Sequence, residues 1–142
     1  MIVRQPIYQT YTEEIVPLGQ QDLHQVETLV NLVQPGYFKP KTFYLGKYFG
    51  IFVSNTLVAI TGERMQMDDY TEVTSVVTHP EHTERGYAKQ LVSYTLNQIF
   101  EQGKTPFLHV LESNAAAIGL YQKLGFIIRR KMDFWKIEIA GK

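Results

Sequence analysis

The sequence predicts an α/β protein with a mixed, mostly antiparallel central sheet that is flanked by helices. Three observations lead to this expectation. Ser54-Asn55-Thr56 separates two apolar stretches, which is typical of a β-hairpin. A strand, a long helix and a second strand follow one another from about Glu72 to Leu111, an order that favours a parallel, right-handed unit. Further strand patterns close the chain after residue 125.

The N-terminal part of the chain predicts a strand, a helix and an irregular connection. Residues 11–18 can form the first strand. Apolar side chains recur at helical spacing over residues 20–33, and Pro35-Gly36 is expected to end that helix. The connection after it, up to residue 48, is rich in aromatic residues, which either pack in the core or shape a substrate pocket.

The rest of the chain alternates between strand and helix patterns. We expect the hairpin strands at 49–53 and 57–67, a strand at 71–79, a helix over 88–100, a short buried strand at 106–111, a helix over 113–125 and one or two strands over 126–139. Gly103 stands where a helix C-cap belongs, and Ser113 or Asn114 can cap the next helix. In the last segment the apolar residues change from even to odd positions, and a bulge or turn near Phe134 would explain this change.

Composition narrows the classes of function. The 142 residues suit one domain, 1–142, and the 14 basic residues balance the 14 acidic ones. This balance argues against nucleic-acid or membrane partners. The chain has no cysteine, which excludes disulfides, thiolate catalysis and Cys-ligated metals, and His79 and His82 lack a further ligand, so we expect no metal. With no signal-peptide pattern, a cytoplasmic protein is the expectation.

The junction between the central strand and the long helix carries a candidate anion site. A helix that starts near Arg85 leaves its first amide groups without intrahelical partners, and its dipole favours an anion there. Gly86 and Ala88 are small enough to let a ligand approach the backbone. The alternative is a turn in which Gly86 only permits tight packing. The segment matches neither a Walker A loop nor a dinucleotide-binding glycine loop.

Two motifs together resemble the GNAT N-acetyltransferase superfamily. Thr83-Glu84-Arg85-Gly86-Tyr87-Ala88 resembles its acyl-CoA-binding motif, Q/R-x-x-G-x-G/A, and residues 111–126, LESNAAAIGLYQKLGF, resemble its second signature. The resemblance is strong from about Val73 to Arg129, and the order of elements extends it over most of the chain. There are two departures. Thr83 replaces the usual Gln or Arg, and Glu84 stands where Gly is frequent, so we expect weakened cofactor binding.

The resemblance implies acetyl-CoA as the co-substrate and a set of residues that bind it. The strand would present backbone amides to the pantetheine arm, and the loop and helix start would bind the pyrophosphate. In chain order the implied residues are Val76, Val77, Thr78, Thr83, Glu84, Arg85, Gly86, Tyr87, Ala88 and Lys89. Asn114 either contacts the pantetheine arm or only caps its helix.

The resemblance also implies two catalytic residues. Tyr121 would donate a proton to the departing thiolate, although a tyrosine among apolar neighbours can equally be a core residue. Glu72 would act as the base, because on a regular strand Glu72, Thr74, Val76 and Thr78 share one face. The alternative is an exposed strand glutamate, with Glu63 as the substitute base.

We therefore expect an N-acetyltransferase that moves an acetyl group from acetyl-CoA to a primary amine by direct attack in a ternary complex. The missing cysteine excludes a cysteine acyl-enzyme. The acceptor would be a small-molecule or peptide amine, and the sequence does not identify it. Two alternatives remain, a non-catalytic acyl-CoA-binding or sensor domain, and a unit that works as a homodimer sharing its C-terminal strands.

Overall fold

The computed structural model describes residues 13–34, 46–64, 66–111, 113–132 and 136–140. Its elements are β1 (Val16–Pro17), α1 (Leu23–Val33), β2 (Tyr48–Val53), β3 (Thr56–Arg64), β4 (Tyr70–Thr78), α2 (Tyr87–Glu101), β5 (Thr105–Leu111), α3 (Ala115–Lys123), β6 (Ile127–Met132) and β7 (Lys136–Ala140), with 3-10 turns at Gln20–Asp22 and Pro80–His82. The expected turn near Phe134 lies outside the described residues, as does most of the aromatic connection.

The described strands form one sheet in the order β1-β2-β3-β4-β5-β7-β6. β4 and β5 pair in parallel, and the other neighbouring strands pair antiparallel. The expected mixed, mostly antiparallel sheet is thus confirmed, including the parallel unit around α2.

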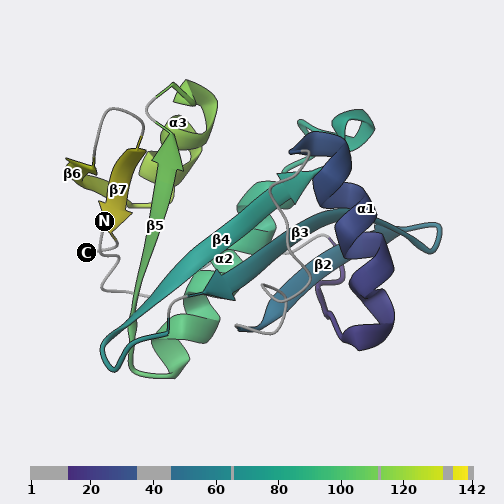
Figure 1. Cartoon of the computed structure of the whole chain (residues 1–142), viewed down its shortest axis with the longest axis horizontal. Coiled ribbons are helices and arrows are strands. Elements are labelled where there is room, and N and C mark those ends of the chain that lie inside the picture. The colour runs from purple at the N-terminus through teal and green to yellow at the C-terminus, as the bar shows by residue number, and fades with distance from the viewer. Residues whose placement is uncertain (1–12, 35–45, 65, 112, 133–135, 141–142) are drawn as a thin grey trace.

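Helices cover the two faces of the sheet (Figure 1). α1 packs on one face, where Val26 and Val30 meet Ile60 and Val77. α2 and α3 lie on the other face, above two adjoining apolar clusters. No described helix is both long and apolar enough to cross a membrane. The two faces therefore have separate cores, with the sheet between them.

Local sequence sets the ends of these elements. Ser54 and Asn55 have φ of 51° and 66°, the left-handed conformation that tight hairpin turns require. Gly103, with φ of 75°, follows the end of α2 as expected for a helix stop. The Asn114 side-chain oxygen accepts a hydrogen bond from the backbone N–H of Ala117 at 3.1 Å, so the expected cap of α3 is confirmed.

A β-bulge in β4 corrects one expectation. Ile60 pairs with Val77 and Gly62 with Thr74, so two residues of β4 stand opposite one residue of β3. Val73 consequently packs on the α2 face and Val77 on the α1 face, although residues four positions apart share a face on a regular strand. The expectation that Glu72, Thr74, Val76 and Thr78 share one face is therefore wrong, because the extra residue reverses the alternation.

β4 and β5 separate soon after they begin. Their parallel pairing covers only Tyr70–Glu72 against Thr105–Phe107, and the two strands diverge beyond it (Figure 1). From residue 73 onward, the edge of β4 that faces β5 has no strand partner among the described residues. We call the interval between the two diverging strand backbones the wedge.

Candidate active site

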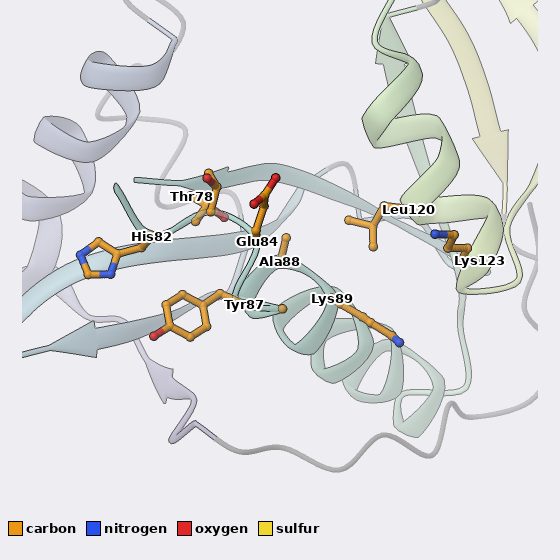
Figure 2. A pocket seen from close by; sticks show the side chains of 10 residues that line it. Thr78, His82, Glu84, Tyr87, Ala88, Lys89, Leu120 and Lys123 are labelled. Carbon is orange, nitrogen blue, oxygen red and sulfur yellow. The ribbon is translucent and has the colours of Figure 1, made fainter. Parts of the chain in front are cut away.

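A surface hollow of about 370 Å³ lies where the end of β4, the loop before α2, the start of α2 and the last turn of α3 meet. Figure 2 shows the side chains around it. The hollow is lined by Thr78, His82, Thr83, Glu84, Gly86, Tyr87, Ala88, Lys89, Leu120 and Lys123. The hollow thus combines residues of both sequence motifs, which are distant in the chain.

The start of α2 gives this hollow its anion-binding character. Gly86 is the N-cap, with φ of 78°, and the first helical hydrogen bond runs from the N–H of Gln90 to the Gly86 carbonyl oxygen. The amides of Tyr87, Ala88 and Lys89 precede that bond, so they have no partner within the helix. These donors and the helix dipole favour a negatively charged group.

Charged side chains of both signs line the hollow. Lys89 and Lys123 are exposed cations in its wall and would attract phosphate. Glu84 opposes them, and its side chain lies between those of Thr78 and Ala88 in Figure 2. The backbone of Glu84 has φ of 65°, a conformation that costs about 1 kcal/mol for a residue with a Cβ. Such a position explains why glycine is frequent there in the superfamily.

Several predicted cofactor residues do not line the hollow. Val76 and Val77 are in β4 outside the lining of the hollow. They come after Glu72, the last β4 residue that pairs with β5. The Arg85 guanidinium is 3.1 Å from Nδ1 of His82. Asn114 is exposed and caps α3. The pantetheine contacts predicted for Val76, Val77 and Asn114 stay predictions.

Tyr121 projects from α3 into the core beside β5. Its ring meets Phe126 edge to face at 5.9 Å, and it belongs to the cluster that contains Leu108 and Val110. Burial raises the pKa of the Tyr121 phenol to about 12, because the charged form would lose its hydration. The phenol therefore stays protonated at neutral pH and can donate a hydrogen bond. Its predicted role toward sulfur stays a prediction.

Glu72 lies at the narrow end of the wedge, and its carboxylate is fully engaged. One oxygen is 2.7 Å from Nε of Arg64, and the other is 2.5 Å from Nδ1 of His109. The Glu72 side chain is only 2% exposed, against 19% for His109 and 30% for Arg64. Its predicted role as base stays a prediction, but His109 offers the more accessible polar atoms.

Aromatic rings surround this ion pair on the same side of the sheet. Phe107 meets Tyr70 at 6.4 Å and His109 at 5.7 Å, both edge to face. Leu108 and Val110 point to the helix-covered side, so the intervening His109 points to the opposite side. Tyr121 and His109 thus lie on different faces of the sheet.

Sequence reasoning did not propose a function for Leu120, Lys123, Arg64 or His109, and it considered His82 only as a metal ligand. His109 left a signal, because it is a polar residue inside an otherwise apolar strand. Arg64 could have been found from the pairing of β3 with β4, which places it opposite Glu72. Leu120 and Lys123 line the hollow because of the way α3 packs against the sheet, and the sequence pattern does not predict that packing.

Glu63 is a second buried carboxyl, separate from the wedge. It is fully buried on β3, and neither of its oxygens has a hydrogen-bond partner among the described residues. Burial raises the pKa of the Glu63 carboxyl above its ordinary value of 4.5, and the charges of Lys47 and Lys104 offset part of that rise. No set of three or more His, Asp or Glu side chains in the described part of the chain converges as metal ligands.

Comparison with known proteins identifies the family. The FR47-like protein family matches residues 48–135, a segment that contains β4, the loop, α2, β5 and α3. The chain belongs to the FR47-like family of GNAT-related proteins. No curated protein matches its sequence. The GNAT resemblance inferred from the two motifs is therefore confirmed.

Solved GNAT structures share the fold of this FR47-like chain. A protein from Novosphingobium aromaticivorans, described as a GNAT acetyltransferase, is 31% identical over 98% of this chain, with a TM-score of 0.83. The FR47-like chain spans only 60% of that protein's length. Arabidopsis thaliana Naa50, solved with a bisubstrate analogue, is 14% identical with a TM-score of 0.83, covering 93% of this chain and 99% of its own.

A third structure was solved with coenzyme A. The PaiA N-acetyltransferase of Thermoplasma acidophilum, in complex with coenzyme A, is 16% identical, has a TM-score of 0.74, and matches over 93% of this chain and 100% of its own. At these identities the last two comparisons establish the fold alone. The FR47-like family match and the Novosphingobium aromaticivorans structure support acyl transfer as the general class of chemistry.

Proposed function

We propose that this protein is an acetyl-CoA-dependent N-acetyltransferase that acetylates a primary amine. The observation that carries the proposal is the hollow at the start of α2, which adjoins the wedge between β4 and β5. A pyrophosphate fits the free amides of Tyr87, Ala88 and Lys89. A pantetheine arm, which contains amides of its own, suits the unpaired edge of β4 at Val76 and Val77.

The residues of the wedge support direct transfer. A backbone N–H near the bulge would stabilise negative charge on the thioester carbonyl oxygen. Tyr121, held protonated by burial, would donate to the departing sulfur. Glu72 belongs to the route by which the amine loses its proton. Because the chain has no cysteine, no cysteine acyl-enzyme can form.

The first test is coenzyme A binding. A saturating concentration of coenzyme A should raise the melting temperature, since a ligand that binds only the folded state stabilises it by mass action. A charge-matched compound that lacks the pantetheine arm, adenosine 3′,5′-bisphosphate, should raise it less. An unchanged melting temperature with coenzyme A would contradict the proposed site.

The second test is turnover. Acetyl-CoA and a panel of small amines, amino acids and peptides with free N-termini should give amine-dependent release of thiol. Stabilisation by coenzyme A without release from any amine would instead favour an acyl-CoA sensor. The same panel would indicate the class of acceptor, because only amines that enter the wedge should be acetylated.

A further inference from the structure

Glu72 and His109 connect two strands at the point where those strands separate. Glu72 is the last β4 residue in the parallel ladder, and His109 lies two residues beyond its partner Phe107 on β5. The hydrogen bond between Oε2 of Glu72 and Nδ1 of His109 crosses the narrow end of the wedge at 2.5 Å. In the proposed acetyl transfer, the reacting groups would meet in this wedge.

His109 is on the side of β5 from which an amine would approach. Its neighbours Leu108 and Val110 belong to the cluster that contains Tyr121, on the helix-covered face. His109 therefore faces away from Tyr121, the proposed proton donor to sulfur, and toward the opposite side of the sheet. Direct attack requires this arrangement, since the nucleophile must reach the thioester from a side that the cofactor does not occupy.

The contacts of Glu72 determine which nitrogen of His109 can react. Arg64 binds one oxygen of Glu72 through Nε at 2.7 Å and the other through a terminal nitrogen at 3.1 Å. The Nδ1–H of His109 donates a hydrogen bond to the Glu72 carboxylate, and in the neutral imidazole this leaves a lone pair on Nε2. Among the side chains that the structure describes, none makes a hydrogen bond to Nε2, and the His109 side chain is partly exposed.

The titratable surroundings of His109 come from three strands. Arg64 of β3 pairs with Glu72, which bonds His109. Tyr70 of β4 packs on Phe107, which in turn packs on His109. The pairing of β5 with β7 places Glu138 opposite His109 in the ladder. Glu72 bonds the imidazole directly. A carboxylate that orients an imidazole is a frequent device for general-base catalysis.

We propose that Nε2 of His109 is the base that takes the proton from the acceptor amine, and that Glu72 is a positioning residue that fixes its tautomer. The inference rests on the proposed acetyl transfer and names the group that was left open there. It moves the role of base from Glu72 to His109, because the Glu72 carboxylate is buried and already shared between Arg64 and His109.

The proton and electron balance of the step is simple. An ammonium group gives one proton to Nε2 of His109, and the neutral amine forms a C–N bond to the thioester carbonyl carbon. The C–S bond breaks and its electron pair stays on sulfur. The second proton of the nitrogen ends on that sulfur, by way of the Tyr121 phenol. The products are the amide, the free thiol and one proton on His109, which passes to solvent.

The test compares His109→Gln with the wild-type protein at pH 6 to 10, using the best amine of the panel. We expect kcat to fall about a hundredfold at neutral pH, which is a usual contribution of a general base. The deficit should shrink at high pH, where the amine is already neutral. KM for acetyl-CoA and the shift in melting temperature with coenzyme A should not change, because His109 does not line the cofactor hollow.

Further variants separate catalysis from folding. Glu72→Gln should reduce kcat less than His109→Gln, and its deficit should likewise shrink at high pH. His24→Gln, on the exposed side of α1, is the matched control and should behave as wild type. Should His109→Gln fail to fold, His109→Ala takes its place, and added imidazole should restore part of its rate.

A direct measurement of the tautomer needs no variant. Long-range ¹H–¹⁵N spectra of the coenzyme A complex should show a proton on Nδ1 of His109 and none on Nε2 at pH 8. A proton on Nε2, or a His109→Gln enzyme with the wild-type rate and pH profile, would overturn the inference while leaving acetyl transfer intact. A wild-type protein that acetylates no amine would overturn both.

Discussion

Glu84 and Gly86 both adopt the left-handed backbone conformation, with φ of 65° and 78°, at the entrance to α2. Two such residues in three positions bend the loop so that the first amides of α2 face the hollow. Gly86 adopts this conformation without strain, whereas Glu84 carries a Cβ that disfavours it. Glu84 also brings a negative charge to a site suited to phosphate.

Replacing Glu84 with glycine should improve both stability and cofactor binding. Relief of the left-handed strain should raise the free energy of unfolding by about 0.5 to 1 kcal/mol. Loss of the carboxylate should tighten coenzyme A binding by about fivefold, a Coulomb effect of roughly 1 kcal/mol for a water-exposed charge. Urea unfolding and calorimetric titration measure the two effects.

Glu84→Gln separates these causes. It removes the charge but keeps a Cβ at positive φ, so it should tighten coenzyme A binding without raising stability. If neither variant binds coenzyme A more tightly, the Glu84 carboxylate does not face the phosphate.

Tyr121→Phe should reduce kcat by at least about tenfold, because it removes the only proposed donor to sulfur. The ring stays in the cluster with Phe126, so the melting temperature near neutral pH should change little. Tyr94→Phe, on α2 against Phe49, removes a phenol away from the wedge and serves as the control. Equal rates for Tyr121→Phe and wild type would remove Tyr121 from the reaction.

The change in unfolding free energy at alkaline pH gives a second test of Tyr121. Burial raises the pKa of its phenol from 10.0 to about 12, so the folded protein holds this proton more tightly than the unfolded chain. Its contribution to stability is complete below pH 10 and is lost as pH rises toward 12. Tyr121→Phe should therefore lose less stability than wild type over that interval.

Sequence patterns predicted the helices and strands well because each depends on residues close together in the chain. The hairpin turn at Ser54 and Asn55 and the cap at Asn114 are local chemistry of this kind. The β4 bulge was not predictable in the same way, since it arises from the pairing of Ile60 with Val77 and of Gly62 with Thr74. Nothing between Thr74 and Val77 marks a bulge, because that segment has neither glycine nor proline.

In the candidate site, too, local features were predicted from the sequence and long-range contacts were not. Gly86 and Ala88 were found from the sequence because the loop and the start of α2 are contiguous. The partners of Glu72 were not, since Arg64 reaches it through a turn and His109 is 37 residues away. Only the sheet register brings these three side chains together, so a glutamate predicted to act alone has two partners.

Glu63→Gln should change how stability depends on pH. The folded-state pKa of Glu63 is raised by burial above the ordinary 4.5, so the folded protein retains this proton longer than the unfolded chain. The associated stability is complete below pH 4.5 and is lost as pH rises through the folded-state pKa. The variant should match wild type at pH 4 and be more stable at pH 8, by urea unfolding.

Glu101→Gln, at the exposed end of α2, is the control for this substitution and should follow the wild-type curve. An identical pH dependence for Glu63→Gln and wild type would mean that Glu63 ionises in the folded protein with the help of Lys47 and Lys104.

Lys89→Ala and Lys123→Ala should each weaken coenzyme A binding by about twofold to fivefold at low ionic strength. Both lysines stand in the wall of the hollow and are exposed, and exposed ion pairs contribute up to about 1 kcal/mol. The difference from wild type should shrink as salt is added, because screening acts on exposed charges first. Lys47→Ala, remote from the hollow, should bind coenzyme A as wild type does. A loss that salt does not reduce would point to altered packing of α3 or α2 rather than to a phosphate contact.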